Sequence, residues 1–178
     1  MSQPDRFALF NRPMPPGYRE ELRELIAAPA AEEHPEERSF LLFQLGELCL
    51  ALPTQVASAV APVLHISPIP HRRNTVLLGL VAFRGEIFPC CSLARILEVA
   101  QQPVGSPRTI FLEEAAGRRW AVPVDAVHGI HIAALGEVTT GTASLAPGWL
   151  RGCFQVDASQ FHLLDHEILF HQLTLATA

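Results

Sequence analysis

Histidine and cysteine side chains could bind a metal ion, and this chain of 178 residues carries eight histidines and four cysteines. Metal sites draw such ligands from short spacings, such as Cys-x-x-Cys or two histidines on one helix face. The sequence has no Cys-x-x-Cys, and the pairs His128/His131 and His162/His166 stand alone. The segment from His166 to His171 resembles a His-Glu-x-x-His zinc helix, but its i, i+5 spacing points the two rings to different faces. We therefore predict no metal site.

Cys90 and Cys91 could instead provide a nucleophile, which requires a thiolate and a neighbouring base such as histidine. Both lie in an apolar string, where the pKa of a thiol rises and the unreactive protonated form is favoured. The sequence also lacks Gly-x-Ser-x-Gly and a glycine-rich phosphate loop. We interpret these two residues, with Cys49 and Cys153, as reduced and buried. A thiol- or metal-dependent enzyme that uses Cys90 or Cys91 with a histidine stays open as an alternative.

Among the acidic residues, Asp125 is the one in a strongly apolar setting, because it follows Val122-Pro123-Val124. A short acidic side chain before a turn often accepts hydrogen bonds from the backbone of that turn. We therefore interpret Asp125 as a cap for the turn that follows it. The chain offers no convincing pair of catalytic carboxylates, and we predict that it is not an enzyme.

Arg84 is the strongest candidate for molecular recognition. An apolar run from Val76 to Phe83 ends at Arg84-Gly85-Glu86, and apolar residues resume at once with Ile87. Gly85 can adopt a positive φ, as a tight turn requires. An arginine held at the surface between buried segments, beside apolar groups, is typical of protein–protein interfaces.

Composition predicts a folded, soluble protein. Apolar residues make up 49% of the chain and charged residues 17%, which is enough to form a core. The net charge is −5, and the basic cluster His71–Arg73 is too short for a nucleic-acid surface. The apolar run Val76–Phe83 is far shorter than the roughly 20 residues that span a bilayer. Because the N-terminus lacks a signal-peptide pattern, we expect a cytoplasmic protein without direct membrane insertion.

Residues 1–38 differ from the rest and are predicted to form an N-terminal extension. Tyr18–Ala28 has apolar residues at helical spacing and ends at a proline, which predicts a short helix. Ala30–Ser39 is charged and predicts a linker. The extension is therefore partly helical, and we place a separate domain at residues 39–175.

Short apolar runs alternate with Gly and Pro throughout that domain, which favours small β-barrels over a doubly wound sheet. We predict strands at residues 40–45, 48–52, 66–69, 87–93, 108–112, 119–124, 150–156 and 161–164. Val76–Ala82 fits either a helical turn or a strand. The order hairpin, short helix, proline-rich edge and apolar strand repeats weakly from Thr109 onward.

Helices are predicted at four places in the same domain. Thr54 is expected to cap a short helix over Gln55–Val60, with Val56 and Val60 on one face. We also predict a helical turn within residues 94–99, a helix-like turn leading into a strand at 125–130, and a final helix at 166–173 capped by Asp165.

Four segments carry motifs in a recognisable order. They are the hairpin Phe40–Pro53, the segment Gly79–Pro89 around Phe83-Arg84-Gly85, the segment Trp120–Gly129, and the closing segment Leu150–Asp165. Together they resemble the CheW-like family of chemotaxis coupling proteins over about residues 39–173. His71–Arg73 and the segment from His162 to His171 are similar to the Wsp-type surface-sensing branch of that family.

The resemblance implies a mainly β fold of two intertwined, SH3-like five-stranded barrels with short helices. It implies an adaptor without activity or cofactor, which links the cytoplasmic tip of a methyl-accepting chemoreceptor to the regulatory domain of a CheA-type histidine kinase. A decoy that binds only one partner is a further alternative. The functionally important arginine of the family corresponds to Arg84.

The partner-binding residues that we predict are Arg84, Gly85, Leu80, Val81, Phe83, Ile87, Val56 and Val60. The chain also departs from the family pattern. Ala82 replaces the usual Asn, Ser92 replaces the Asp of the Val-Asp-Leu motif, and the acid of an early Val-x-Glu-Val segment is Ser58 or Ala59.

Overall fold

The computed structural model describes residues 37–70, 75–100, 105–139, 145 and 148–177, which belong to the unit Glu36–Ala178. The predicted helix Tyr18–Ala28 and the basic loop His71–Arg73 lie outside the described residues. None of the helices that the structure describes is long and apolar enough to cross a membrane.

The fold is mainly β, as the sequence predicts. In chain order its elements are β1 (Glu37–Leu45), β2 (Leu48–Pro53), the 3-10 turn η1 (Thr54–Val56), β3 (Ala57–Pro62), β4 (Leu77–Phe83), β5 (Glu86–Cys91), α2 (Leu93–Ile96), β6 (Arg108–Glu113), β7 (Arg119–Val124), β8 (Ala126–Ala134), the 3-10 turn η2 (Leu135–Glu137), β9 (Leu150–Val156), β10 (Ser159–Leu164) and α3 (His166–Thr177).

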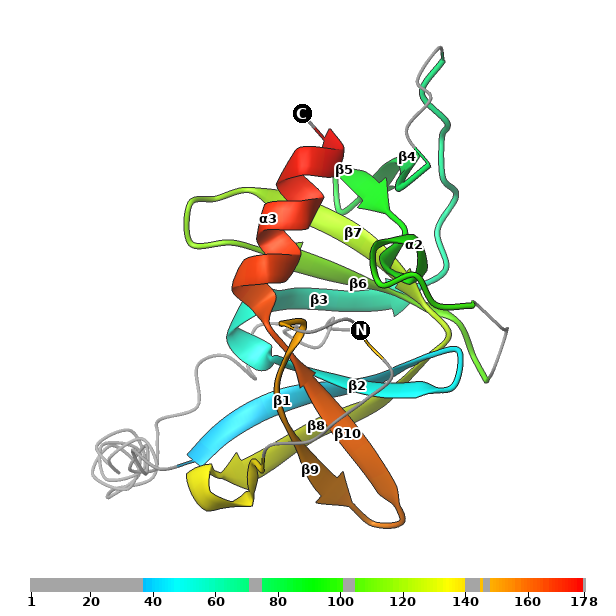
Figure 1. Ribbon diagram of the computed structural model, residues 1–178. Helices are drawn as coiled ribbons and strands as arrows, with labels where there is room; N and C mark the ends of the chain where they lie inside the picture. Colours follow the sequence, from blue (N-terminus) through cyan, green and yellow to red (C-terminus); the bar gives the residue numbers. More distant parts are fainter. Residues whose placement is uncertain (1–36, 71–74, 101–104, 140–144, 146–147, 178) are drawn as a thin grey trace, which may run out of the picture. The chain divides into compact units, whose positions relative to one another are not determined.

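The strands form two five-stranded SH3-like barrels (Figure 1). In the first barrel the strand order is β8-β1-β2-β10-β9, and in the second it is β3-β6-β7-β5-β4. Each contains one parallel pair, β10 with β2 and β5 with β7. The chain repeats hairpin, strand, hairpin, and each barrel combines the leading hairpin of one repeat with the last three strands of the other. The repeat predicted from the sequence therefore also explains why the two barrels are intertwined: each barrel takes strands from both repeats.

Three apolar clusters hold this arrangement together. Phe40, Phe154 and their neighbours fill the first barrel, while Phe88 and Phe111 belong to the cluster that fills the second. The largest cluster joins outward-facing residues of both barrels to α3. There α3 packs on the second barrel, with the ring of Phe170 stacked 5.5 Å from that of Trp120. Burial of this apolar area is the main stabilising contribution.

The predicted helix over Gln55–Val60 is wrong. Helical geometry ends with the short turn η1, and the chain continues as β3, in which Val60 pairs with Ile110 of β6. Thr54 makes no cap; its hydroxyl donates to the carbonyl oxygen of Ser39 at 3.3 Å. Pairing with a strand some fifty residues away outweighs the weak local helical pattern, as is common for short apolar segments.

The structure also decides the predictions for four other segments. The ambiguous run Val76–Ala82 is a strand from Leu77 onward and belongs to β4. The expected edge strand at residues 66–69 reduces to one bridge between Ser67 and Leu80. β8 begins directly at Ala126, without the helix-like turn that we predicted. The cap of α3 is confirmed, because Asp165 Oδ1 accepts hydrogen bonds from the N–H groups of Glu167 and Ile168.

Candidate partner-binding surface

The turn between β4 and β5 consists of Arg84 and Gly85. Phe83 pairs with Glu86 on either side, so the two residues form a two-residue hairpin loop. Their φ angles are 51° and 83°, both positive, as in the turn type that matches the twist of antiparallel strands. Gly85 adopts such an angle freely, whereas a positive φ is unfavourable for arginine. The tight turn expected from the sequence is present, and Arg84 lies at its exposed tip.

The guanidinium of Arg84 is free to bind a partner. Its Cζ lies 5.0 Å from the ring centroid of Phe83, and that ring stacks on Phe111 at 4.2 Å. The nearby carboxylate of Glu86 is bound by Arg119 at 2.6 Å. In the part of the chain that the structure describes, no acidic side chain pairs with Arg84. A guanidinium stacked on an aromatic ring with its donors unused is suited to binding a carboxylate or carbonyl group.

An apolar surface lies next to this turn, and we call it the outer patch: Leu80, Ala82, Ile87 and Pro89. Leu80 pairs with Pro89, and Ala82 pairs with Ile87, so the four side chains share one face of the β4–β5 hairpin. Leu80 is 36% exposed and Ile87 is 71% exposed. Ala82 and Pro89 are apolar as well, so the four residues of the outer patch carry no polar side chain.

The predicted contact residues fall into two groups. Arg84, Gly85, Leu80 and Ile87 are brought together at the surface, with Phe83 half-buried beneath Arg84.

The other three predicted residues lie elsewhere. Val81 is only 1% exposed because it alternates with Leu80 and points into the second barrel. Val56 belongs to the large core cluster between the barrels. Neither side chain belongs to the exposed surface around Arg84. Val60 is exposed, but it lies on β3, at the other end of the strand order from β4.

The cysteines are buried, apart from the half-buried Cys49. Burial raises the pKa of the Cys90 thiol to about 11, so Cys90 is protonated at neutral pH. Cys91 is also fully buried. Over the described residues, no three His, Cys, Asp or Glu side chains are grouped so that they could hold a metal ion.

Sequence reasoning missed two features outside the Arg84 surface. Ile130 and Ile132 of β8 are exposed apolar residues on one face, and the alternation with Gly129 and His131 was the available signal. Asp125 is buried, but β8 begins directly after it, so the turn that we expected it to cap is not formed. Its Oδ2 accepts a hydrogen bond from the N–H of Gly46, in the β1–β2 turn, at 2.6 Å.

The family model of the CheW-like domain matches residues 39–174. The chain belongs to the CheW-like domain family. This CheW-like chain is 28% identical to Protein FrzA of Myxococcus xanthus over 103 residues, which are 58% of this chain and 63% of FrzA. The matched region thus spans less than two thirds of that relative.

A solved structure shows the same fold. The CheW-like chain superimposes on the scaffolding protein TtCheW from Thermoanaerobacter tengcongensis with a TM-score of 0.64 and 20% sequence identity. The match covers 75% of this chain and 88% of TtCheW. The expected family and the two-barrel fold are confirmed, while assignment to the Wsp-type branch stays a prediction.

Proposed function

We propose that this chain is a non-enzymatic cytoplasmic adaptor. It couples the cytoplasmic tip of a methyl-accepting chemoreceptor to the regulatory domain of a CheA-type histidine kinase within a signalling array. Membership of the CheW-like domain family supports this proposal, and the similar TtCheW is described as a scaffolding protein.

The observation that carries the proposal is the free guanidinium of Arg84 beside the outer patch. Arg84 supplies hydrogen-bond donors and a positive charge that Glu86 does not neutralise, because Glu86 is bound by Arg119. Leu80 and Ile87 supply apolar area that a partner would remove from water. An arginine surrounded by apolar contacts that exclude water is the usual composition of an interface hot spot.

The alternatives are less well supported. A thiol enzyme would need an accessible thiolate, whereas Cys90 and Cys91 are fully buried and burial raises the pKa of Cys90. A decoy would use the same surface but bind only one partner. The difference between adaptor and decoy therefore lies in the number of partners bound at once.

A binding experiment with three purified proteins tests the proposal. The full chain is mixed with a receptor cytoplasmic fragment and a kinase regulatory domain, first separately and then together, and the complexes are separated by size. An adaptor forms both binary complexes and a ternary complex. Arg84→Glu is expected to abolish at least one binary complex while the protein stays folded, and Arg38→Glu, a charge reversal at an exposed arginine of β1, serves as control.

The proposal fails if the wild-type chain binds neither protein, or if Arg84→Glu binds both at wild-type affinity. Formation of one binary complex and no ternary complex would identify a decoy.

A further inference from the structure

A groove of about 640 Å³ lies where η1, the β6–β7 turn and the first turn of α3 meet. We call it the α3 groove. Val56 and Phe170 contribute apolar surface to it, and Glu113, Glu114, His166 and Glu167 contribute polar groups. Among the described residues the buried Nδ1 of His166 has no hydrogen-bond partner. The groove therefore combines an apolar floor with acidic walls.

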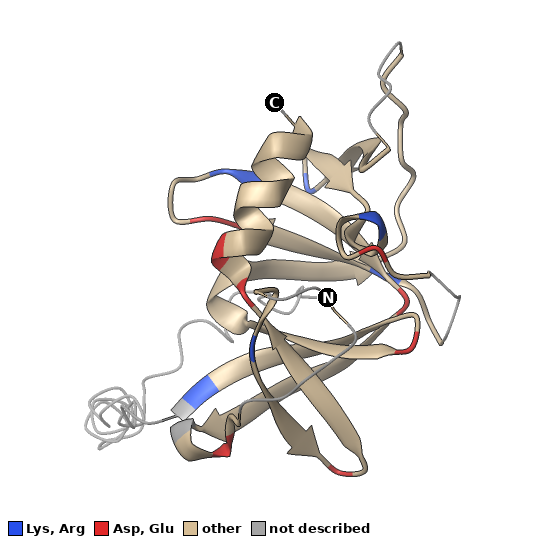
Figure 2. Ribbon diagram, viewed as in Figure 1, with Lys and Arg blue, Asp and Glu red and all other residues tan. Residues whose placement is uncertain are grey.

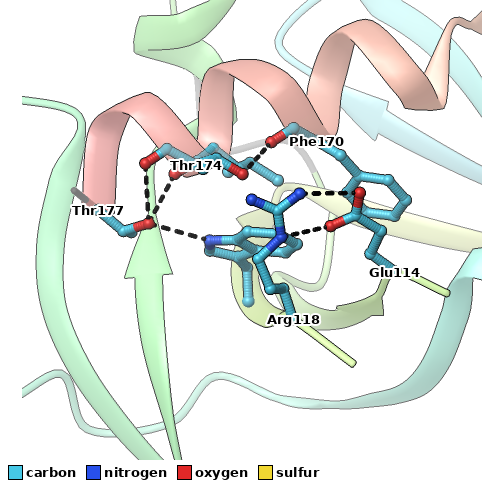
Figure 3. A network of polar contacts seen from close by, with 7 residues as sticks. Glu114, Arg118, Phe170, Thr174 and Thr177 are labelled. Carbon is cyan, nitrogen blue, oxygen red and sulfur yellow. Dashed lines mark hydrogen bonds and ion pairs between the residues drawn. The ribbon is translucent and has the colours of Figure 1, made fainter. Parts of the chain in front are cut away.

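Two arginines of the β6–β7 hairpin, beside the α3 groove, are already bound to carboxylates. Figure 3 shows the guanidinium of Arg118 bonded to both carboxylate oxygens of Glu114, at 2.7 and 3.0 Å. The same guanidinium lies over the ring of Trp120, 5.9 Å from its centroid. Arg119, which is opposite Glu113 in the strand ladder, is bound to Glu86 at 2.6 Å.

The other wall has a similar surplus of negative charge. Glu167 Oε2 lies 3.1 Å from Arg151, but Arg151 also binds Asp165 at 2.8 Å. One guanidinium is thus shared by two carboxylates. Figure 2 shows acidic residues at the start of α3 and on the β6–β7 hairpin, the two elements that contribute Glu167 and Glu113 to the groove. Among the described residues, the groove is lined by the three carboxylates of Glu113, Glu114 and Glu167, and each guanidinium that pairs with these acids or lies opposite them also binds another carboxylate or is held by Glu114.

We propose that the α3 groove binds a basic segment of a partner protein. Lysine or arginine side chains of that segment bind Glu113 and Glu167, and an aliphatic side chain packs on Val56 and Phe170. The excess negative charge selects a cationic partner, and the apolar floor favours a segment with an apolar anchor over a purely charged one. The Arg84 turn offers a positive charge and hydrogen-bond donors, so it would repel the basic segment that the α3 groove binds.

Two short synthetic peptides test this site on the full-length, isotope-labelled protein. One alternates Lys and Leu, and the other contains Lys alone. Nuclear magnetic resonance titration measures affinity and maps the amide groups that shift. The Lys-Leu peptide is expected to shift residues of the β6–β7 turn and the first turn of α3. It is expected to bind more tightly than the Lys peptide, increasingly so at higher salt, because screening weakens only the charge contacts.

Two alanines of one turn provide a matched pair of variants. Ala115 lines the α3 groove, whereas its exposed neighbour Ala116 does not. Ala115→Trp is expected to weaken binding of the Lys-Leu peptide by about tenfold or more, because the indole occupies the groove. Ala116→Trp is expected to leave the affinity within about twofold of wild type, as for a residue outside the contact.

A second variant changes the charge without filling the groove. Glu113→Gln combined with Glu167→Gln is expected to weaken binding and to reduce its dependence on salt. Equal affinity of the wild-type protein and Ala115→Trp would overturn the proposal. So would shifts spread over other acidic surfaces, such as that of Glu137, or no binding at all. These outcomes are independent of the receptor and kinase experiment, so either proposal can fail alone.

Discussion

The buried carboxylate of Asp125 accepts a hydrogen bond from the backbone N–H of Gly46, 79 residues earlier in the chain, at 2.6 Å. Gly46 occupies the β1–β2 turn of the first barrel with a φ of 59°. A Cβ at this position would lie 2.5 Å from the carbonyl oxygen of Ala100, so the turn requires glycine. Asp125 follows β7 of the second barrel, and its own N–H donates to Gln44 at 3.0 Å. The two hydrogen bonds of Asp125 thereby hold the connection from β7 to β8, where the chain passes from the second barrel to the first, against the β1–β2 hairpin.

Replacement of Asp125 by alanine is expected to destabilise the protein. The change leaves the buried N–H of Gly46 without its acceptor, which costs about 1–3 kcal/mol in the free energy of unfolding. Urea unfolding followed by circular dichroism measures the difference. Glu47→Ala removes an exposed carboxylate from the same turn and should change stability by less than about 0.5 kcal/mol. Equal midpoints for the two variants would contradict the assigned role.

Ile87→Asp tests the outer patch separately from the arginine. The substitution places a charge in the centre of the apolar surface, and desolvating it in an interface is unfavourable. We expect a loss of about tenfold or more in affinity for the partner that Arg84→Glu also affects. Calorimetric titration against the receptor fragment and the kinase domain gives both affinities. A variant that loses one partner while Arg84→Glu loses the other would show that the two features are separate sites.

His162 is expected to make the protein less stable in mild acid. Burial lowers the pKa of His162 in the folded state, because the charged imidazolium loses water. The unfolded chain then binds a proton more readily, so stability falls as the pH decreases below the unfolded value of about 6.5. In His162→Gln, unfolding free energy should depend less on pH in this range. Parallel pH curves for the two proteins would contradict the prediction.

Asp165 is expected to affect the stability of the protein at a lower pH than His162 does. Burial alone would raise the pKa of Asp165, but hydrogen bonds from Arg151 and from the backbone of Ile168 and Glu167 outweigh it, and the pKa is lowered. Its stabilising contribution is therefore present above the unfolded value of about 3.9 and is lost as the pH falls through the lower folded value.

The variant Asp165→Asn separates this effect from general acid denaturation. At neutral pH it should be less stable than wild type, because Arg151 loses an ionic partner. The difference in unfolding free energy should shrink in strong acid, where the carboxyl of the wild-type protein is protonated. Thermal unfolding at a series of pH values measures it, and a difference that stays constant into strong acid would rule out the proposed contribution.

Features with a strong local signal could be predicted from the sequence. The glycine turns at Gly46 and Gly85 separate apolar runs, and each run forms a strand in a hairpin. Asp165 precedes an apolar helical pattern and caps α3 as expected. Local signals failed between Gln55 and Val60, where a few small and β-branched residues fit a helix or a strand equally well. Pairing with β6 decides that segment, and no local pattern contains this information.

The candidate partner-binding surface was also only partly predictable from the sequence. The apolar run ending at Arg84-Gly85, and its place among ordered motifs, were enough to indicate a partner-binding turn in a CheW-like chain. Only the tertiary structure decided which neighbours contribute to it. Side chains of a strand alternate between two faces, and the register with β5 places Leu80 outside and Val81 inside. The α3 groove likewise arises only when α3 packs beside the β6–β7 turn, because residues distant in sequence meet there through folding.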